Sequence, residues 1–282
     1  MRIPVTTLND GYDFPLLGLG TYKLRGDEAE RVVRTAIELG YRHIDTATLY
    51  ENEVEVGKAI NAAIAAGDVT RDELFITTKL ANDDQHRPAE AYQESLRRLD
   101  LEFIDLYLVH WPMPQRGTYV SAFEQIAQIQ GMGQLQSVGV ANFYEEVLDE
   151  LIDATGVTPA LNQIELHLGF TQPELRAYHE EHGIVTEAWA PLARGANFDA
   201  PELVAVADKH GVTPAQAALA YLLHLGCSVV PKTANPQRLV ENLAAVEVEL
   251  GDDDVEMLNA VAGERLWGHP RTFPEQAKGR IV

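Results

Sequence analysis

The feature that most constrains the fold is an alternation of short apolar segments with longer amphipathic segments, which recurs eight times within 282 residues. Each apolar segment has the length of a buried strand, and each amphipathic segment has apolar residues at helical spacing. Between residues 28 and 39, for example, Val32 and Ala36 recur at this spacing, and Gly40 follows as a helix stop. Strands that alternate with helices predict a parallel sheet covered by helices.

The predicted elements begin with a hairpin, whose strands 5–8 and 14–17 flank the turn signal Asn9-Asp10-Gly11. The eight repeated strands are predicted at 17–20, 43–45, 74–79, 104–109, 136–140, 160–164, 184–189 and 228–231. The helices are predicted at 28–39, 53–65, 88–99, 120–129, 145–154, 173–182, 201–210, 214–225 and 236–245, with a terminal helix at 252–261.

Eight strand–helix units in fewer than 300 residues fit a closed (β/α)8 TIM barrel, here one domain over residues 1–282 with an extra helix and tail at its end. The alternative is an open doubly wound sheet, which requires a G-x-G-x-x-G motif after a strand. Neither Gly18-Leu19-Gly20 nor Gly131-Met132-Gly133 continues into that motif. The sequence therefore favours the barrel.

The net charge of the chain excludes some classes of binding partner. Its 43 acidic and 22 basic residues give a net charge of −21. Nucleic acids and anionic membranes are bound through clustered lysine and arginine, so neither is an expected partner. A small anionic ligand is still compatible with this composition, because a local basic pocket can form on an acidic protein.

The single cysteine, Cys227, excludes an intramolecular disulfide and a thiolate metal cage within one chain. Its apolar neighbours are typical of a buried thiol. The first residues lack the apolar core of a signal peptide. The longest uncharged stretch, 211–231, contains Pro214 and Gln216 and is interpreted as a buried helix and strand. We therefore expect a cytoplasmic protein.

Ionisable residues end three successive predicted strands: Asp45, Lys79 and His110. Barrel active sites lie at this end of the strands, and Tyr50 follows within reach. An ammonium stabilises a phenolate, and a carboxylate keeps the ammonium charged, so we predict that Lys79 lowers the pKa of Tyr50 for proton transfer. In the alternative, Asp45 and Lys79 form only a structural pair, Tyr50 is a loop aromatic, and His110 caps its strand.

Several motifs, in order and at matching spacing, resemble the aldo-keto reductase superfamily, especially the prokaryotic branch that includes 2,5-diketo-gluconate reductases. They cover nearly the whole chain and are Gly40-Tyr41-Arg42-His43-Ile44-Asp45-Thr46-Ala47 with Tyr50, Thr78-Lys79, Val109-His110-Trp111-Pro112, Gly139-Val140-Ala141-Asn142-Phe143, Asn162-Gln163-Ile164-Glu165-Leu166-His167, and Pro231-Lys232-Thr233 with Arg238, Glu241 and Asn242.

The resemblance implies reduction of an aldehyde or ketone by NADPH, without a metal, on substrates such as small dicarbonyls and sugar-derived keto acids. It implies that Tyr50 donates the proton, with Lys79 and its partner Asp45 tuning that group. It also implies that His110 orients the carbonyl, so that the developing oxyanion is met by Tyr50 and His110.

The resemblance also implies a set of cofactor contacts. Asn142 and Gln163 match residues that hold the carboxamide, and Trp189 matches the aromatic residue stacked on the nicotinamide. The remaining cofactor positions are Lys232, Thr233 and Arg238 for the 2′-phosphate, Glu241 and Asn242 for adenine, and Gly20, Thr21 and Leu192. The alternative is that Trp189 belongs to the core and that Lys232 and Arg238 are ordinary surface residues.

The expected substrate walls are aromatic: Tyr22, Trp111, Phe143 and Trp267. Trp267 could equally be a packing anchor for the tail. Two departures from the family pattern are Ala141 and Ala190, which stand where serine is common and remove hydrogen-bond donors near the nicotinamide. The sequence after Lys79 also lacks a tryptophan that is frequent there, which is expected to open one side of the pocket.

Two other functions compete with the reductase. A non-catalytic barrel that binds a nucleotide and regulates a partner would not need the complete set of four ionisable residues. A metal-dependent hydrolase would need clustered metal-ligand histidines, which the sequence does not offer. We expect a monomer, because no exposed apolar stripe is evident in the sequence.

Overall fold

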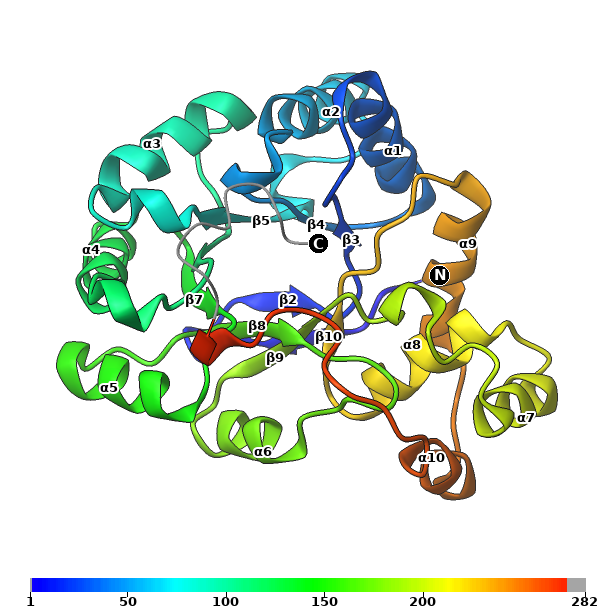
Figure 1. Cartoon of the computed structure of the whole chain (residues 1–282). Helices are drawn as coiled ribbons and strands as arrows, with labels where there is room; N and C mark the ends of the chain where they lie inside the picture. The colour runs from blue at the N-terminus through cyan, green and yellow to red at the C-terminus, as the bar shows by residue number, and fades with distance from the viewer. Residues whose placement is uncertain (1, 273–282) are drawn as a thin grey trace.

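Eight parallel strands lie in the centre of the computed structural model, which describes residues 2–272 (Figure 1). They pair in chain order and are β3 (Leu19–Gly20), β4 (His43–Asp45), β5 (Phe75–Leu80), β6 (Leu106–Val109), β7 (Ser137–Ala141), β8 (Leu161–Glu165), β9 (Val185–Trp189) and β10 (Ser228–Val229). The N–H of Gly18 donates to the carbonyl of Val229 at 2.9 Å, next to a parallel bridge between Leu17 and Val229. These bonds join the first and last strands, so the predicted barrel is confirmed.

Ten α-helices surround the strands within the described residues (Figure 1). They are α1 (Gly26–Leu39), α2 (Glu53–Ala66), α3 (Pro88–Leu99), α4 (Tyr119–Gly131), α5 (Glu145–Thr155), α6 (Pro173–Glu181), α7 (Pro201–His210), α8 (Pro214–His224), α9 (Pro236–Ala244) and α10 (Asp252–Asn259). All the predicted helices and strands are present, with ends displaced by no more than two residues.

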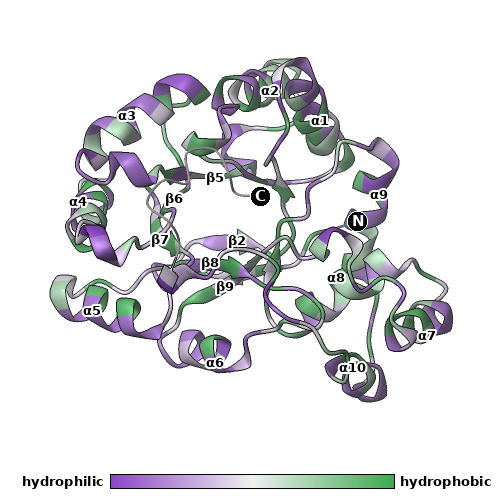
Figure 2. Ribbon diagram, viewed as in Figure 1, coloured by the Kyte–Doolittle hydropathy of each residue, from purple (hydrophilic) through white to green (hydrophobic). Residues whose placement is uncertain are grey.

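Helix α1 illustrates why these segments fold as they do. Its buried residues include Val32 and Ala36, which lie on one face, while its outer face is polar. Figure 2 shows the same division around the ring, with hydrophobic residues turned toward the strands. Gly40 ends the helix at φ 109°, and its N–H reaches the carbonyls of Ala36 and Ile37. A left-handed residue at this position favours glycine.

The predicted N-terminal hairpin closes one end of the barrel. Strand β1 (Val5–Thr7) pairs antiparallel with β2 (Asp13–Pro15). Phe14 is completely buried, and its ring lies 4.9 Å from those of both His43 and Phe75. Because these neighbours begin β4 and β5, the hairpin covers the N-terminal ends of the strands. The C-terminal ends are left for the loops that form a cavity.

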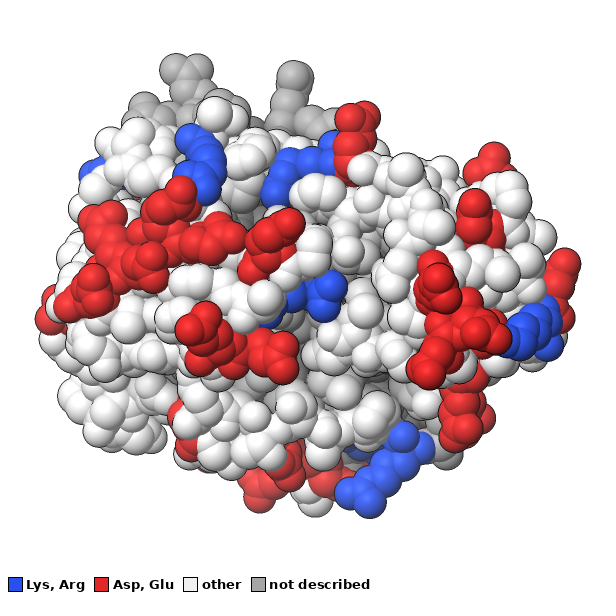
Figure 3. Space-filling view, turned by 90° about the horizontal axis from the view of Figure 1, so that it is seen from below, with Lys and Arg blue, Asp and Glu red and all other residues white. Residues whose placement is uncertain are grey.

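The surface reflects the acidic composition. Figure 3 shows one face on which acidic side chains outnumber basic ones. No helix in residues 2–272 is long and apolar enough to cross a membrane. Cys227 is buried as predicted, and burial raises the pKa of its thiol to about 11. The part of the predicted tail from residue 273 onward lies outside the described residues.

Packing of α2 against the C-terminal end of α3 gives a test of the fold. A Cβ at Gly57 would lie 2.1 Å from the carbonyl oxygen of Leu99, whereas nothing lies within 4 Å of one at Gly131 in α4. We expect Gly57→Ala to destabilise the protein by about 1–3 kcal/mol through overpacking. Gly131→Ala is expected to be neutral or slightly stabilising. Urea denaturation of both variants measures the difference, and equal stabilities would contradict this packing.

Candidate active site

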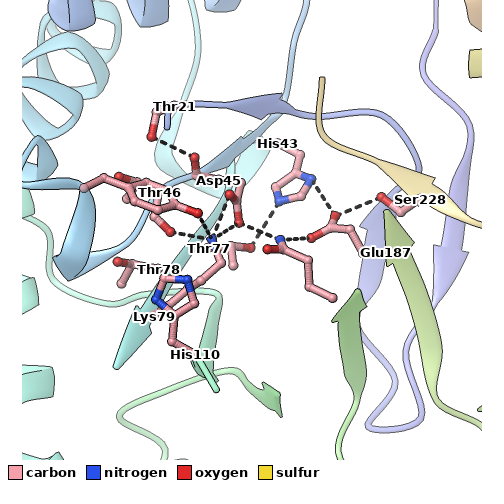
Figure 4. Close-up of polar contacts among 12 residues, drawn as sticks. Thr21, His43, Asp45, Thr46, Thr77, Thr78, Lys79, His110, Glu187 and Ser228 are labelled. Atoms are coloured by element: carbon pink, nitrogen blue, oxygen red, sulfur yellow. Dashed lines mark hydrogen bonds and ion pairs between the residues drawn. The ribbon is translucent and has the colours of Figure 1, made fainter. Parts of the chain in front are cut away.

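A buried ion pair lies at the centre of the candidate site (Figure 4). Lys79 on β5 is 0% exposed, and its Nζ donates to the two carboxylate oxygens of Asp45 at 2.8 and 2.6 Å. A third bond of 2.8 Å reaches the backbone carbonyl of Thr46. Three short bonds match the three donors of an ammonium. Asp45 and Thr46 therefore offset the cost of burying the Lys79 charge.

Tyr50 lies beside this pair in the 3₁₀ turn η1 (Thr48–Tyr50), with its hydroxyl 3.5 Å from Nζ of Lys79. Burial raises the pKa of Tyr50 well above 10, and the Asp45 carboxylate raises it further. The sequence predicted a pKa lowered by Lys79, and this direction is wrong for the structure. The reason is that burial disfavours the charged phenolate, while Lys79 makes its shorter bonds to Asp45 and Thr46 rather than to Tyr50. Tyr50 is therefore a neutral phenol that can donate a proton.

His110 faces Tyr50 from the residue after β6. Their rings lie 5.9 Å apart in an edge-to-face arrangement, and the backbone N–H of His110 donates to the backbone carbonyl of Leu80. Burial lowers the pKa of His110 well below 6.5, with a further decrease from the Lys79 charge. Its Nδ1 is buried without a hydrogen-bond partner in residues 2–272. His110 is thus a neutral imidazole at neutral pH.

A cavity of about 800 Å³ opens above these groups at the C-terminal ends of the strands. It brings together most of the residues predicted from the sequence. Its lining includes Gly20, Tyr22, Asp45, Tyr50, His110, Trp111, Asn142, Gln163, Trp189, Leu192, Lys232, Thr233, Arg238, Glu241, Asn242 and Trp267. The close approach of Gly20 is specific to glycine, because a Cβ there would lie 2.7 Å from the carbonyl oxygen of Val230.

Three predicted site residues do not line this cavity. Lys79 lies beneath it, and the buried hydroxyl of Thr21 donates to the carbonyl of Asp45 at 2.9 Å. Phe143, expected as a substrate wall, is 1% exposed, and its ring packs against Tyr119. The side-chain amide of Asn162 also donates to the Phe143 carbonyl at 2.9 Å. The backbone is thereby held so that the Phe143 ring belongs to the core, which corrects that prediction.

One end of the cavity carries side-chain amides and indole rings. Asn142 has φ 63°, and its Nδ2 donates to the carbonyl of His110 at 2.9 Å. Its Oδ1 accepts from Nε1 of Trp189 at 2.8 Å. The partly exposed ring of Trp189 meets Trp267 at 5.3 Å. Trp267 therefore lines the cavity and also packs against a neighbouring ring.

Two basic residues of the cavity lining, Lys232 and Arg238, flank the first residue of helix α9 in the sequence. Both are exposed and have no ion-pair partner in the part of the chain that the structure describes. Helix α9 begins between them, and Oδ1 of Asn235 accepts from the N–H groups of Gln237 and Arg238. A helix N-terminus beside two cations is suited to a phosphate group.

Two buried residues beneath the site, Glu187 and His43, are not among the site residues predicted from the sequence. Glu187 on β9 is completely buried and accepts from Nε2 of Gln163 at 2.6 Å (Figure 4). Burial raises its pKa to about 8, with a contribution from Asp45. Burial likewise lowers the pKa of His43 to about 3. A carboxylate within a short apolar strand was the signal available for Glu187.

The chain is similar to known proteins over most of its length. The model of the Aldo/keto reductase family matches residues 16–262. Methylglyoxal reductase DkgA of Salmonella typhimurium is 46% identical over 272 residues, covering 95% of this chain and 98% of the relative.

Two solved structures are also similar to the chain. A mutant of Gox0644 in complex with NADPH has a TM-score of 0.91 at 40% identity, covering 96% of this chain and 99% of that one. A Bombyx mori aldo-keto reductase in complex with NADP has a TM-score of 0.86 at 35% identity, covering 93% and 94%.

The raised pKa of Glu187 predicts how stability depends on pH. A carboxyl whose pKa is higher in the folded state disfavours folding once it ionises, so its contribution worsens from about pH 4.5 to pH 8. Glutamine imitates the protonated acid and does not titrate. We expect Glu187→Gln to match the wild type in thermal midpoint at pH 5 and to exceed it at pH 9. A difference of the same size at both pH values would contradict this prediction.

Proposed function

This chain belongs to the aldo/keto reductase family, and we propose that it reduces small dicarbonyls and sugar-derived keto acids in the cavity above Lys79. It is an NADP-dependent oxidoreductase that converts aldehydes or ketones to alcohols. The observation that carries the assignment of the catalytic groups is the buried Asp45–Lys79 pair, with the Tyr50 hydroxyl 3.5 Å from the ammonium.

The lining of the cavity fits NADPH, which supplies a hydride when it is bound. Asn142 and Gln163 offer amide groups for the carboxamide, and Trp189 offers a ring face for the nicotinamide. Lys232, Thr233 and Arg238 would hold the 2′-phosphate, with Glu241 and Asn242 at the adenine. Gly20 and Leu192 complete the lining of the cofactor site. Thr21 contributes indirectly, through its bond to the backbone of Asp45.

The four central groups divide the work of the reaction. The neutral imidazole of His110 orients the carbonyl oxygen of the substrate, and Tyr50 transfers its phenolic proton to that oxygen as negative charge develops there. The phenolate that remains on Tyr50 is stabilised by the Lys79 ammonium. Asp45 keeps this ammonium in place throughout. This proton, together with the hydride that bound NADPH would supply, would convert the carbonyl group to an alcohol.

The substrate end of the cavity is lined by Tyr22, Trp111 and Trp267. Aromatic walls suit a small carbonyl compound, and a relative named methylglyoxal reductase supports this substrate class. We further propose a cytoplasmic monomer. Its net charge of −21 disfavours a nucleic-acid partner.

Tyr50 provides the test of the proton donor. Phenylalanine keeps the ring but removes the proton, so we expect Tyr50→Phe to reduce kcat for methylglyoxal by at least about 100-fold. NADPH binding should persist, because the ring still lines the cavity. NADPH oxidation and fluorescence titration measure the two effects. Tyr12→Phe, which removes the hydroxyl of an exposed tyrosine that does not line the cavity, is the matched control and should retain turnover.

The proposed reductase activity would be refuted if the wild type binds NADPH tightly but reduces no carbonyl compound in a broad panel. That result would instead support a regulatory nucleotide-binding barrel.

Arg238 provides the test of the phosphate site. Removing one cation from a charged hydrogen bond costs about 1.5–3 kcal/mol, so Arg238→Ala should weaken NADPH binding by about tenfold or more. NADH lacks the 2′-phosphate and should bind nearly as before. Arg97→Ala, which removes an exposed cation on α3, is the control for overall charge. Equal losses of affinity for NADPH and NADH would contradict the assignment.

A further inference from the structure

The side-chain amide of Gln163 is held by two carboxylates at the base of the cavity. Its Nε2 donates to Oδ2 of Asp45 at 2.9 Å and to Oε1 of Glu187 at 2.6 Å. A primary amide has two N–H donors, and both are used here. Within residues 2–272, both side-chain bonds of Gln163 are made by Nε2 and none by Oε1. Gln163 also lines the cavity. Gln163 therefore presents an acceptor to a ligand.

The neighbouring amide of Asn142 is held with the opposite polarity. Its Oδ1 accepts from the indole N–H of Trp189, and one N–H of Nδ2 donates to the carbonyl of His110. The second N–H of Nδ2 is the remaining donor. An acceptor on Gln163 and a donor on Asn142 together match a primary amide, which carries one carbonyl oxygen and two N–H groups.

Two carboxylates hold Gln163. Asp45 also pairs with Lys79, whereas Glu187 does not. A single hydrogen bond to Asp45 would leave the Gln163 amide free to rotate about that bond. A second bond fixes the plane of the amide and thus the direction of Oε1. Glu187 supplies this second bond from a position with no access to solvent.

We propose that Glu187 is a positioning residue, which fixes Gln163 so that its Oε1 accepts an N–H of the cofactor's carboxamide. This inference rests on the proposed binding of NADPH in the same cavity. It assigns Glu187 a role in recognising the amide group and none in proton transfer to the substrate.

The groups that face Glu187 allow this role in both of its protonation states. Oε2 accepts from the hydroxyl of Ser228 at 3.0 Å and lies 3.7 Å from Nδ1 of His43. Asp45 and Lys79 lie on the far side of Gln163 from Glu187. A proton on Oε2 leaves Oε1 free to accept from Gln163. Ionisation of Glu187 therefore does not reverse the polarity of the amide.

The test compares NADP⁺ with its 3-acetylpyridine analogue, in which a methyl ketone replaces the carboxamide and removes the N–H donors. Dissociation constants are measured by fluorescence quenching, without turnover. We expect the wild type to bind NADP⁺ about tenfold more tightly, the effect of one hydrogen bond to an otherwise unpaired acceptor. The thionicotinamide analogue, which keeps the N–H donors, is the control ligand.

Two variants separate the hydrogen bond from the charge of Glu187. Glu187→Met keeps the length of the side chain but removes the acceptor, so the preference for NADP⁺ over the acetylpyridine analogue should fall to about twofold. Glu187→Gln removes the charge and keeps an acceptor, so the tenfold preference should be retained. The preference between NADP⁺ and the thionicotinamide analogue should be the same in all three proteins.

The proposal is overturned if the wild type binds NADP⁺ and the acetylpyridine analogue equally. It is also overturned if Glu187→Met retains the full preference, or if Glu187→Gln loses as much of it as Glu187→Met. The wild-type result stands even if Glu187→Met does not fold. Absence of NADP⁺ binding by the wild type would refute the proposed function itself, which distinguishes the two failures.

Discussion

The structure depends most on the burial of one ammonium, Lys79, inside the barrel. An unpaired charge at this depth would be strongly unfavourable, so the surrounding strands must supply acceptors. Asp45 and the carbonyl of Thr46 do so, at distances of 2.6 to 2.8 Å. Tyr50, buried beside this pair, stays a protonated phenol, because burial and the Asp45 charge raise its pKa. Tyr50 can therefore be a proton donor before the reaction, and Lys79 would stabilise the phenolate left on Tyr50 after the proton is transferred.

The sequence predicted the barrel and the catalytic set for the same physical reason. Charged groups at the ends of otherwise apolar strands, such as Asp45 and Lys79, are placed together when the strands are parallel and closed. The direction of the Tyr50 pKa and the inward position of Phe143 could not be predicted in this way. Both depend on the tertiary structure, the first on the burial of Tyr50 beside Asp45 and the second on contacts with Asn162 and Tyr119.

The net charge and the charge of the site belong to different length scales. A charge of −21 acts through solvent, where interactions beyond about 10 Å are screened at physiological salt. Lys232, Arg238 and the N-terminus of α9 line the proposed phosphate site, where they would act at hydrogen-bond range. An acidic protein can therefore bind an anionic cofactor, because the contacts that select the ligand are local.

The loops that follow the strands hold their side chains in the cavity at a conformational cost. Five cavity-lining residues other than glycine have a positive φ: Lys23, Asn142, Ala190, Ala193 and Arg194. Left-handed backbone at such residues is unfavourable and persists where surrounding contacts fix it. At Asn142, the N–H donates to the carbonyl of Gln163 at 2.9 Å, and the side chain bonds to Trp189. The barrel thus stabilises a strained turn at the point where Asn142 enters the cavity.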